Sequence, residues 1–114
     1  PEDLLKCSSM GVDMFDCVMP TRHARTGSLF VKAGKINIKN SQFKTDPDPI
    51  DPDCSCYTCL NYSKAYLRHL SMAGEILAMH LLTVHNSTFY QQWMVSIRKA
   101  IADDTPFNME WSDC

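Results

Sequence analysis

Three cysteines within six residues, in the segment CSCYTC at residues 54–59, constrain the fold more than any other feature. They follow KTDPDPIDPD, a run rich in proline and aspartate that is predicted to be a loop, since proline disrupts helices and sheets. A loop of this composition needs something to hold it. Thiolates at this spacing are typical of structural zinc, which takes four protein ligands in a tetrahedron. We therefore expect one structural zinc ion, bound by Cys54, Cys56, Cys59 and a fourth residue.

The fourth ligand is expected to be one of the histidines, which are His23, His69, His80 and His85. Apolar residues from about 61 to 102 recur at three- and four-residue steps, which predicts helices with a bend near residues 71–75. If the two helices run antiparallel, the ligand lies about as far after the bend as Cys59 lies before it. His85 fits this position best, so Cys54, Cys56, Cys59 and His85 form the predicted zinc site.

Composition favours a single globular domain that is 45% hydrophobic and 21% charged over 114 residues. A net charge of −2 excludes general attraction for nucleic acid, so any such binding needs a local basic patch. No apolar run approaches the ~20 residues that span a bilayer, and no signal peptide is recognised, so we expect a cytoplasmic protein with no membrane partner. The remaining cysteines are scattered, which favours a metal site over a disulfide framework. Because the chain starts at Pro1 without methionine, we expect a piece of a longer protein.

The N-terminal part predicts alternating elements. Residues 1–11 are compatible with a short helix that stops at Gly11, and VDMFDCVM at 12–19 predicts a buried strand ended by Pro20. Residues 28–40 predict a hairpin around Ala33-Gly34-Lys35. A helix followed by a buried strand is the unit of α/β folds, so the fold class is predicted to be α/β.

In the C-terminal part, Asn86-Ser87-Thr88 predicts a second helix start, ahead of a predicted core of Phe89, Tyr90 and Trp93. Tyr62, Tyr66 and His69 follow an i, i+4, i+7 course, which places them on one helix face. This face is either core or an interface.

Asp16 lies in the middle of an apolar run, where a charge is expensive to bury. The carboxyl ends of buried strands are where barrel enzymes keep catalytic groups, and Arg22 and Arg25 follow at a place where guanidinium groups could meet phosphates or base edges. The plainer alternative is an ion pair between Asp16 and Arg22 that closes the strand end. Asp13 could equally be the reactive carboxylate, and Cys17 is expected to be a small buried hydrophobe.

Several motifs together resemble one family. GVDMFDCVMPTRHARTG, CSCYTC, YSKAYLRHL, EILAMHLLTVHN and FYQQWM are similar to the C-terminal part of the tRNA-guanine transglycosylases, in unbroken order over residues 1 to about 102. The resemblance implies the late portion of a (β/α)8 TIM barrel with a zinc-binding subdomain and C-terminal helices. Its parts would be residues 1–26 with a barrel helix, a strand and the nucleophile, 27–45 with a hairpin, 46–102 with the zinc-binding subdomain and helices, and a 103–114 tail that departs from the family and is expected to fray or dock loosely.

The resemblance also implies a function. The family exchanges guanine at the wobble position of a tRNA anticodon for a 7-deazaguanine base, preQ1 or queuine, during queuosine synthesis. Asp16 would be the nucleophile toward ribose C1′, and two displacements would preserve the configuration there, as in retaining glycosidases. Arg22 and Arg25 would contact the anticodon loop, and the tyrosine and histidine face would join two subunits of a homodimer. The family's zinc ligands coincide with the set chosen by spacing.

Two further expectations follow. The family's base pocket, including a second aspartate that handles protons, lies earlier in its chain, so these 114 residues alone are expected to be inactive. An alternative is a noncatalytic zinc-stabilised module that binds tRNA or a partner subunit, and Asp16 argues against it because a scaffold needs no nucleophile. A generic zinc-ribbon nucleic-acid binder fits poorly without a basic surface.

Overall fold

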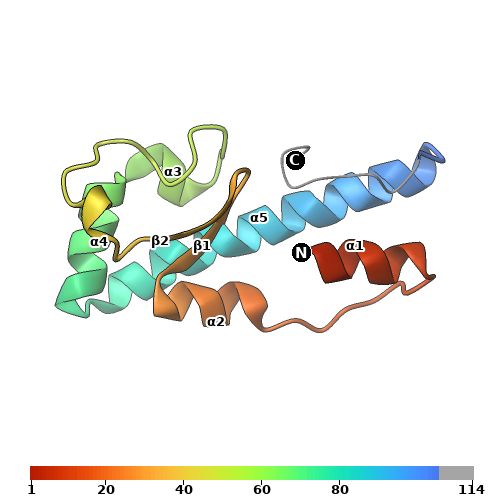
Figure 1. Cartoon of the computed structure of the whole chain (residues 1–114), viewed down its shortest axis with the longest axis horizontal. Helices are drawn as coiled ribbons and strands as arrows, with labels where there is room; N and C mark the ends of the chain where they lie inside the picture. Colours follow the sequence, from red (N-terminus) through yellow and green to blue (C-terminus); the bar gives the residue numbers. More distant parts are fainter. Residues whose placement is uncertain (106–114) are drawn as a thin grey trace.

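The computed structural model describes residues 1–105, so the expectation for the tail from residue 106 onward lies outside the described part of the chain. The long helix α5 (Ile76–Ala102) follows the long axis of a body that measures 45 × 24 × 21 Å. The other elements are α1 (Glu2–Ser9), α2 (Met19–Thr26), β1 (Ser28–Val31), β2 (Gly34–Asn37), the short 3-10 helix η1 (Ser41–Phe43), α3 (Tyr57–Asn61) and α4 (Lys64–Ala73). Figure 1 shows α3, α4 and the loop that precedes α3 gathered with the β1–β2 hairpin at one end of α5, and α1 lying nearer its other end.

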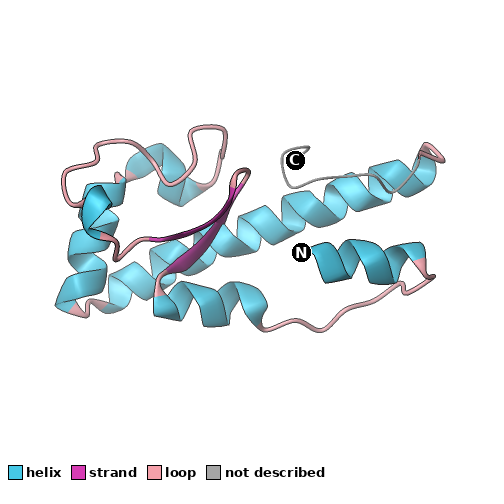
Figure 2. Cartoon of the chain, viewed as in Figure 1, coloured by secondary structure: helices cyan, strands magenta, loops and turns pink. Residues whose placement is uncertain are grey.

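The first helix is confirmed, but the strand predicted over residues 12–19 is wrong. Residues 12–18 form irregular backbone, and Met19 already belongs to α2 (Figure 2). A strand needs a hydrogen-bonded neighbour, and in the part of the chain that the structure describes the only sheet is the β1–β2 hairpin. Cys17 is exposed, so its expected burial is wrong as well. Pro20 occupies the first turn of α2, where its missing N–H costs nothing.

The predicted hairpin is confirmed, with β1 antiparallel to β2 and Ser28 opposite Asn37. Helix α2 leads straight into it through Gly27, whose φ of 83° is left-handed. A Cβ at Gly27 would also lie only 3.3 Å from Cγ2 of Ile38, so glycine permits both the turn and the close packing. The consequence is a tight connection between α2 and the hairpin.

The predicted bend between two helices is confirmed, and it falls at Gly74, with a φ of 74° after α4. The second helix start predicted at Asn86-Ser87-Thr88 is wrong, because α5 runs unbroken through these residues. Asn86 does not cap a helix, since its buried side chain bonds to the hairpin instead.

The core lies where the hairpin and α2 to α4 pack against α5. Phe30 of β1 stacks on Phe89 at a centroid distance of 5.8 Å and meets Tyr90 edge-on at 5.1 Å. Trp93 is fully buried, so the predicted aromatic core of α5 is confirmed. None of the helices within residues 1–105 combines the length and apolar character needed to cross a bilayer.

Candidate metal centre

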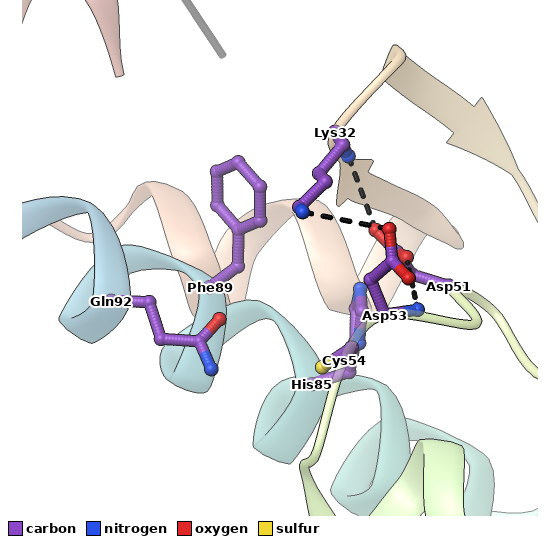
Figure 3. A pocket seen from close by; sticks show the side chains of 7 residues that line it. All are labelled: Lys32, Asp51, Asp53, Cys54, His85, Phe89 and Gln92. Carbon is purple, nitrogen blue, oxygen red and sulfur yellow. Dashed lines mark hydrogen bonds and ion pairs between the residues drawn. The ribbon is translucent and has the colours of Figure 1, made fainter. Parts of the chain in front are cut away.

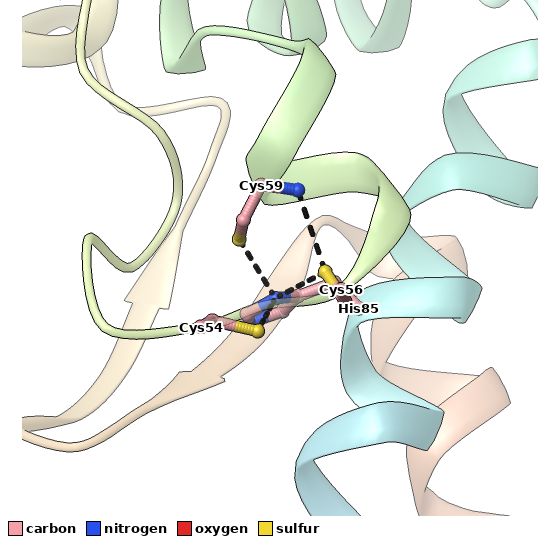
Figure 4. A group of neighbouring side chains, drawn as sticks. All are labelled: Cys54, Cys56, Cys59 and His85. Carbon is pink, nitrogen blue, oxygen red and sulfur yellow. Dashed lines mark hydrogen bonds between the residues drawn. The ribbon is translucent and has the colours of Figure 1, made fainter.

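The four predicted zinc ligands lie together, as Figure 4 shows, with all their ligand atoms within 4.8 Å of one another. Nδ1 of His85 lies 3.7, 3.6 and 3.3 Å from the sulfurs of Cys54, Cys56 and Cys59 respectively. A tetrahedral zinc ion with its usual Zn–S and Zn–N bond lengths holds sulfur and nitrogen roughly 3.6 Å apart. The donor set therefore fits one zinc ion, and the predicted ligands are confirmed.

Local helix geometry brings two of the sulfurs together. Cys56 is the N-cap of α3, and its sulfur accepts a hydrogen bond from the N–H of Cys59 at 3.4 Å. The buried hydroxyl of Thr58 donates to the carbonyl of Leu81 at 2.6 Å, which fastens α3 to α5 one helical turn before His85. This short helix was not predicted, but it explains why the spacing of the cysteines suits a metal.

A hydrogen bond to the backbone of β1 fixes the orientation of His85. Its Nε2 lies 2.8 Å from the carbonyl oxygen of Phe30, and because a carbonyl can only accept, Nε2 carries the proton. Nδ1 therefore presents its lone pair to the three sulfurs. A histidine that ligates a metal characteristically donates its other N–H in this way, so the site has the orienting contact that a zinc ligand needs.

The charges in the cluster also favour a cation. Contacts with Cys54 and Cys59 lower the pKa of the Cys56 thiol, and contacts with Cys54 and Cys56 raise the pKa of the Cys59 thiol, because neighbouring thiols share their protons. Three thiolates cannot ionise side by side without a compensating positive charge. Four protein ligands leave no open position for water, so the ion is structural and not catalytic.

The acidic loop has anchors of its own, which makes it less dependent on metal than its composition suggested. The carboxylate of buried Asp51 accepts hydrogen bonds from the N–H groups of Lys32 at 3.1 Å and of Asp53 at 3.0 Å. Asp46 pairs with Lys64 at 2.8 Å. Sequence reasoning missed these anchors, although aspartate commonly bonds to the N–H two residues later.

A pocket of about 120 Å³ opens beside the centre, lined by Cys54 and by His85, Phe89 and Gln92 of α5 (Figure 3). Lys32 reaches across it to Asp53 at 3.5 Å. Cys54 is the only sulfur ligand that is not fully buried. The pocket therefore gives solvent its approach to the metal centre.

Asp16 and the two arginines lie outside this centre. Asp16 is exposed in the irregular segment before α2, and Arg22 and Arg25 are exposed on α2 itself. Their spacing of three residues places the two guanidinium groups on one side of the helix. The ion pair between Asp16 and Arg22 is absent from the salt bridges formed among residues 1–105.

Comparison with known proteins agrees with the resemblance. A sequence model of the family described as queuine tRNA-ribosyltransferase matches residues 1–110. The chain belongs to the queuine tRNA-ribosyltransferase family. The match continues past residue 102, where the resemblance was expected to end.

Individual relatives support this membership. The chain is 60% identical over 104 residues to the queuine tRNA-ribosyltransferase of Photobacterium profundum, covering 91% of this chain and 28% of the relative. It is 58% identical to that of Aliivibrio fischeri, with the same coverage. For Actinobacillus pleuropneumoniae the identity is 57%, over 91% of this chain and 27% of the relative. The chain thus spans a little over a quarter of the length of these family members.

The aromatic face of this family member differs from the prediction. Tyr62 ends α3, whereas Tyr66 and His69 belong to α4, so the three do not share one helix. The rings of Tyr62 and Tyr66 nevertheless stack, with centroids 5.6 Å apart. Tyr57 joins them edge-on to Tyr62 at 5.9 Å. Tyr66 is 42% exposed and His69 is also exposed, whereas Tyr62 is half-buried and packs against the core, so the face is only partly covered.

Proposed function

We propose that this chain is part of a cytoplasmic tRNA-guanine transglycosylase, which exchanges the guanine at the anticodon wobble position for a 7-deazaguanine base, preQ1 or queuine. The observation that supports this most is the 60% identity to a queuine tRNA-ribosyltransferase, in a chain that keeps a complete zinc ligand set. Because the chain covers 28% of that relative, the activity belongs to the whole enzyme and not to this segment alone.

The apolar side chains ahead of α2 support a place in a (β/α)8 barrel. Met14 is 88% exposed, Met10 75% and Val18 49%, although all three are apolar. Such a run is normally covered by another surface. We propose that residues 12–18 pair with neighbouring strands in the full-length barrel, which would bury these side chains and bring Asp16 to the carboxyl end of a strand.

In the proposed reaction, a carboxylate oxygen of Asp16 attacks C1′ of the wobble nucleotide. The C1′–N9 bond breaks as the new C–O bond forms, and guanine leaves with the bonding electron pair and takes up a proton from the family's second, proton-handling aspartate, which lies outside these 114 residues. The incoming base then attacks C1′ through its ring nitrogen and gives its N–H proton to that aspartate, while the C–O bond breaks and Asp16 leaves as a carboxylate. Two inversions at C1′ restore the original configuration.

Arg22 and Arg25 are the proposed contacts to the anticodon loop. Both lie on α2, which begins three residues after Asp16, so the RNA would meet the nucleophile and the guanidinium groups together. Guanidinium groups form bidentate hydrogen bonds with phosphates and with guanine edges. The zinc ion would supply only structural stabilisation, by holding α3 and its loop against α5.

A base-exchange assay tests this function. The full-length enzyme that contains this segment is expected to incorporate labelled guanine into tRNA, whereas residues 1–114 alone should incorporate none, because the barrel is open and the family's proton-handling aspartate lies elsewhere. Counts of labelled guanine in precipitated tRNA measure the exchange. Exchange by the isolated segment would show that the missing residues are dispensable. Tight tRNA binding by an inactive full-length protein would instead favour a noncatalytic zinc-stabilised module.

We also propose that the aromatic face formed by Tyr62, Tyr66 and His69 joins two subunits of a homodimer. Changing Tyr62→Ala together with Tyr66→Ala is expected to shift the full-length enzyme toward monomer, because tyrosine rings typically supply much of an interface's affinity, and the exposed ring of Tyr66 stacks on the half-buried ring of Tyr62. Light scattering across micromolar concentrations measures the shift. Ile101→Ala, which removes an apolar side chain exposed at the far end of α5, is the control. An unchanged mass in the tyrosine variant would remove this face from the interface.

A further inference from the structure

Asn86 is fully buried in α5, and both the oxygen and the nitrogen of its side-chain amide form hydrogen bonds. Its Oδ1 accepts a hydrogen bond from the N–H of Phe30 at 3.2 Å. Its Nδ2 donates to the carbonyl of Pro20 and to the carbonyl of Ser28, each at 3.0 Å. The amide has two N–H donors, so both are engaged.

The partners of Asn86 lie at the two ends of α2. Pro20 is in the first turn of the helix, and Ser28 follows Gly27, which ends it. Helix α2 packs against α5 and β1, with Ala24 buried and the ring of His23 edge-on to Phe30 at 5.2 Å, but no side chain caps its N-terminus. The bonds from Asn86 add directed contacts at both ends of this packed helix, and so help to fix the orientation of α2 and of Arg22 and Arg25.

Asn86 and its neighbour His85 also hold the same residue of β1. His85 donates to the carbonyl of Phe30 at 2.8 Å, while Asn86 accepts from the N–H of Phe30. A zinc ion that fixes Nδ1 of His85 thus fixes the backbone of Phe30, which is the third partner of Asn86. The hydrogen bonds form a continuous connection from the metal centre to both ends of α2.

We propose that Asn86 is a positioning residue for RNA binding, which orients α2 and links that orientation to the zinc centre. This rests on the proposed function, in which Arg22 and Arg25 contact the anticodon loop. Asn86 acts through these arginines and touches no RNA, since its side chain has no exposed surface. Its loss should therefore weaken RNA binding while the zinc stays bound.

The test compares Asn86→Ala with Thr88→Val in the full-length, zinc-loaded enzyme. Thr88 also lies on α5, but its hydroxyl donates to the carbonyl of Val84 in the same helix at 2.9 Å, so it controls for general destabilisation of α5. In Asn86→Ala the amide hydrogens of residues 22–26 should exchange roughly tenfold faster, and KM for tRNA should rise by a similar factor with kcat little changed. Thr88→Val should leave both unchanged. Loss of zinc from Asn86→Ala, or equal effects in both variants, would overturn the proposal.

A double-mutant cycle with Arg22→Ala separates the proposal from the function on which it rests. If Asn86 acts through α2, the effects of Asn86→Ala and Arg22→Ala on anticodon stem-loop binding should be less than additive, whereas independent effects should add. If Arg22→Ala and Arg25→Ala leave binding unchanged, the proposed RNA contacts are wrong. Hydrogen exchange then still decides whether Asn86 orients α2.

The wild-type enzyme gives a measurement that needs no substitution at Asn86. Chelating the zinc should accelerate amide hydrogen exchange in residues 22–26. Without the metal, His85 is no longer held in place, and it is linked through Phe30 and Asn86 to Pro20 of α2. Full protection of these amides after the zinc has been removed would contradict the link to the metal centre.

Discussion

His85→Ala is expected to empty the metal centre almost completely. The substitution removes one of four ligands and also leaves the carbonyl of Phe30 without the donor that now lies 2.8 Å away. Losing an orienting partner of a ligand typically costs roughly 10- to 100-fold in metal affinity, and losing the ligand itself should cost more. Elemental analysis of reduced protein should therefore find one zinc per wild-type chain and very little in the variant.

His80→Ala and His69→Ala are the matched controls for this result. Both histidines are exposed and neither belongs to the ligand cluster, so both variants should retain zinc as the wild type does. Comparable loss from His80→Ala would overturn the assignment of His85. Wild-type protein that is reduced, chelator-free and still without zinc would end the metal interpretation altogether.

The same variant should show where the metal stabilises the fold. Residues 54–59 carry three of the four zinc ligands, so their amides should lose protection first, even though Thr58 still bonds to the carbonyl of Leu81. The preceding loop should keep part of its protection, because Asp51 and Asp46 hold it through direct bonds to Lys32 and Lys64.

The metal centre could be predicted from the sequence because its geometry depends on local features. Cys56 and Cys59 are separated by one helical turn, and the position of His85 follows from the antiparallel course of α4 and α5 around Gly74. Helical rise and an obvious glycine stop were enough to place the fourth ligand. The hairpin was predictable for the same reason, since its alternation and its turn are local.

Asn86 shows why other parts could not be predicted. An asparagine followed by serine and threonine is a good helix start, and nothing nearby in the sequence argues against one. The competing partners of its side chain, Phe30 and Pro20, lie 56 and 66 residues away along the chain. Hydrogen bonds from these distant partners to the buried amide outweigh the hydrogen bond that Asn86 could make as a helix N-cap. Only the tertiary structure reveals these partners.

The strand predicted over residues 12–19 was wrong for a related reason. Its apolar composition is typical of a buried strand, but a strand forms only where a neighbouring strand offers hydrogen bonds. In the described structure none lies beside it, and Met14 and Val18 are left exposed. Pro20, interpreted as the end of a strand, instead begins α2, because proline suits both positions.

Asp16→Asn is expected to abolish the covalent adduct between the full-length enzyme and RNA. An amide is a poor nucleophile toward C1′ and offers no negative charge to an oxocarbenium-like centre. Base exchange should fall by roughly 10⁴- to 10⁶-fold, the range seen when a catalytic nucleophile or a residue that acts with it is removed. Trapping with an anticodon stem-loop, followed by a denaturing gel, would display the adduct as a slower band in the wild type alone.

Binding should survive the substitution, which separates chemistry from recognition. Asparagine is nearly isosteric with aspartate, and Asp16 is exposed and forms no salt bridge with any of residues 1–105. Removing a negative charge also cannot weaken attraction to phosphates. Arg22 and Arg25 remain on α2 to contact the RNA. Asp13→Asn is the matched control, because Asp13 is exposed in the same irregular segment and should keep its adduct. An adduct that survives Asp16→Asn and disappears in Asp13→Asn would move the nucleophile to Asp13.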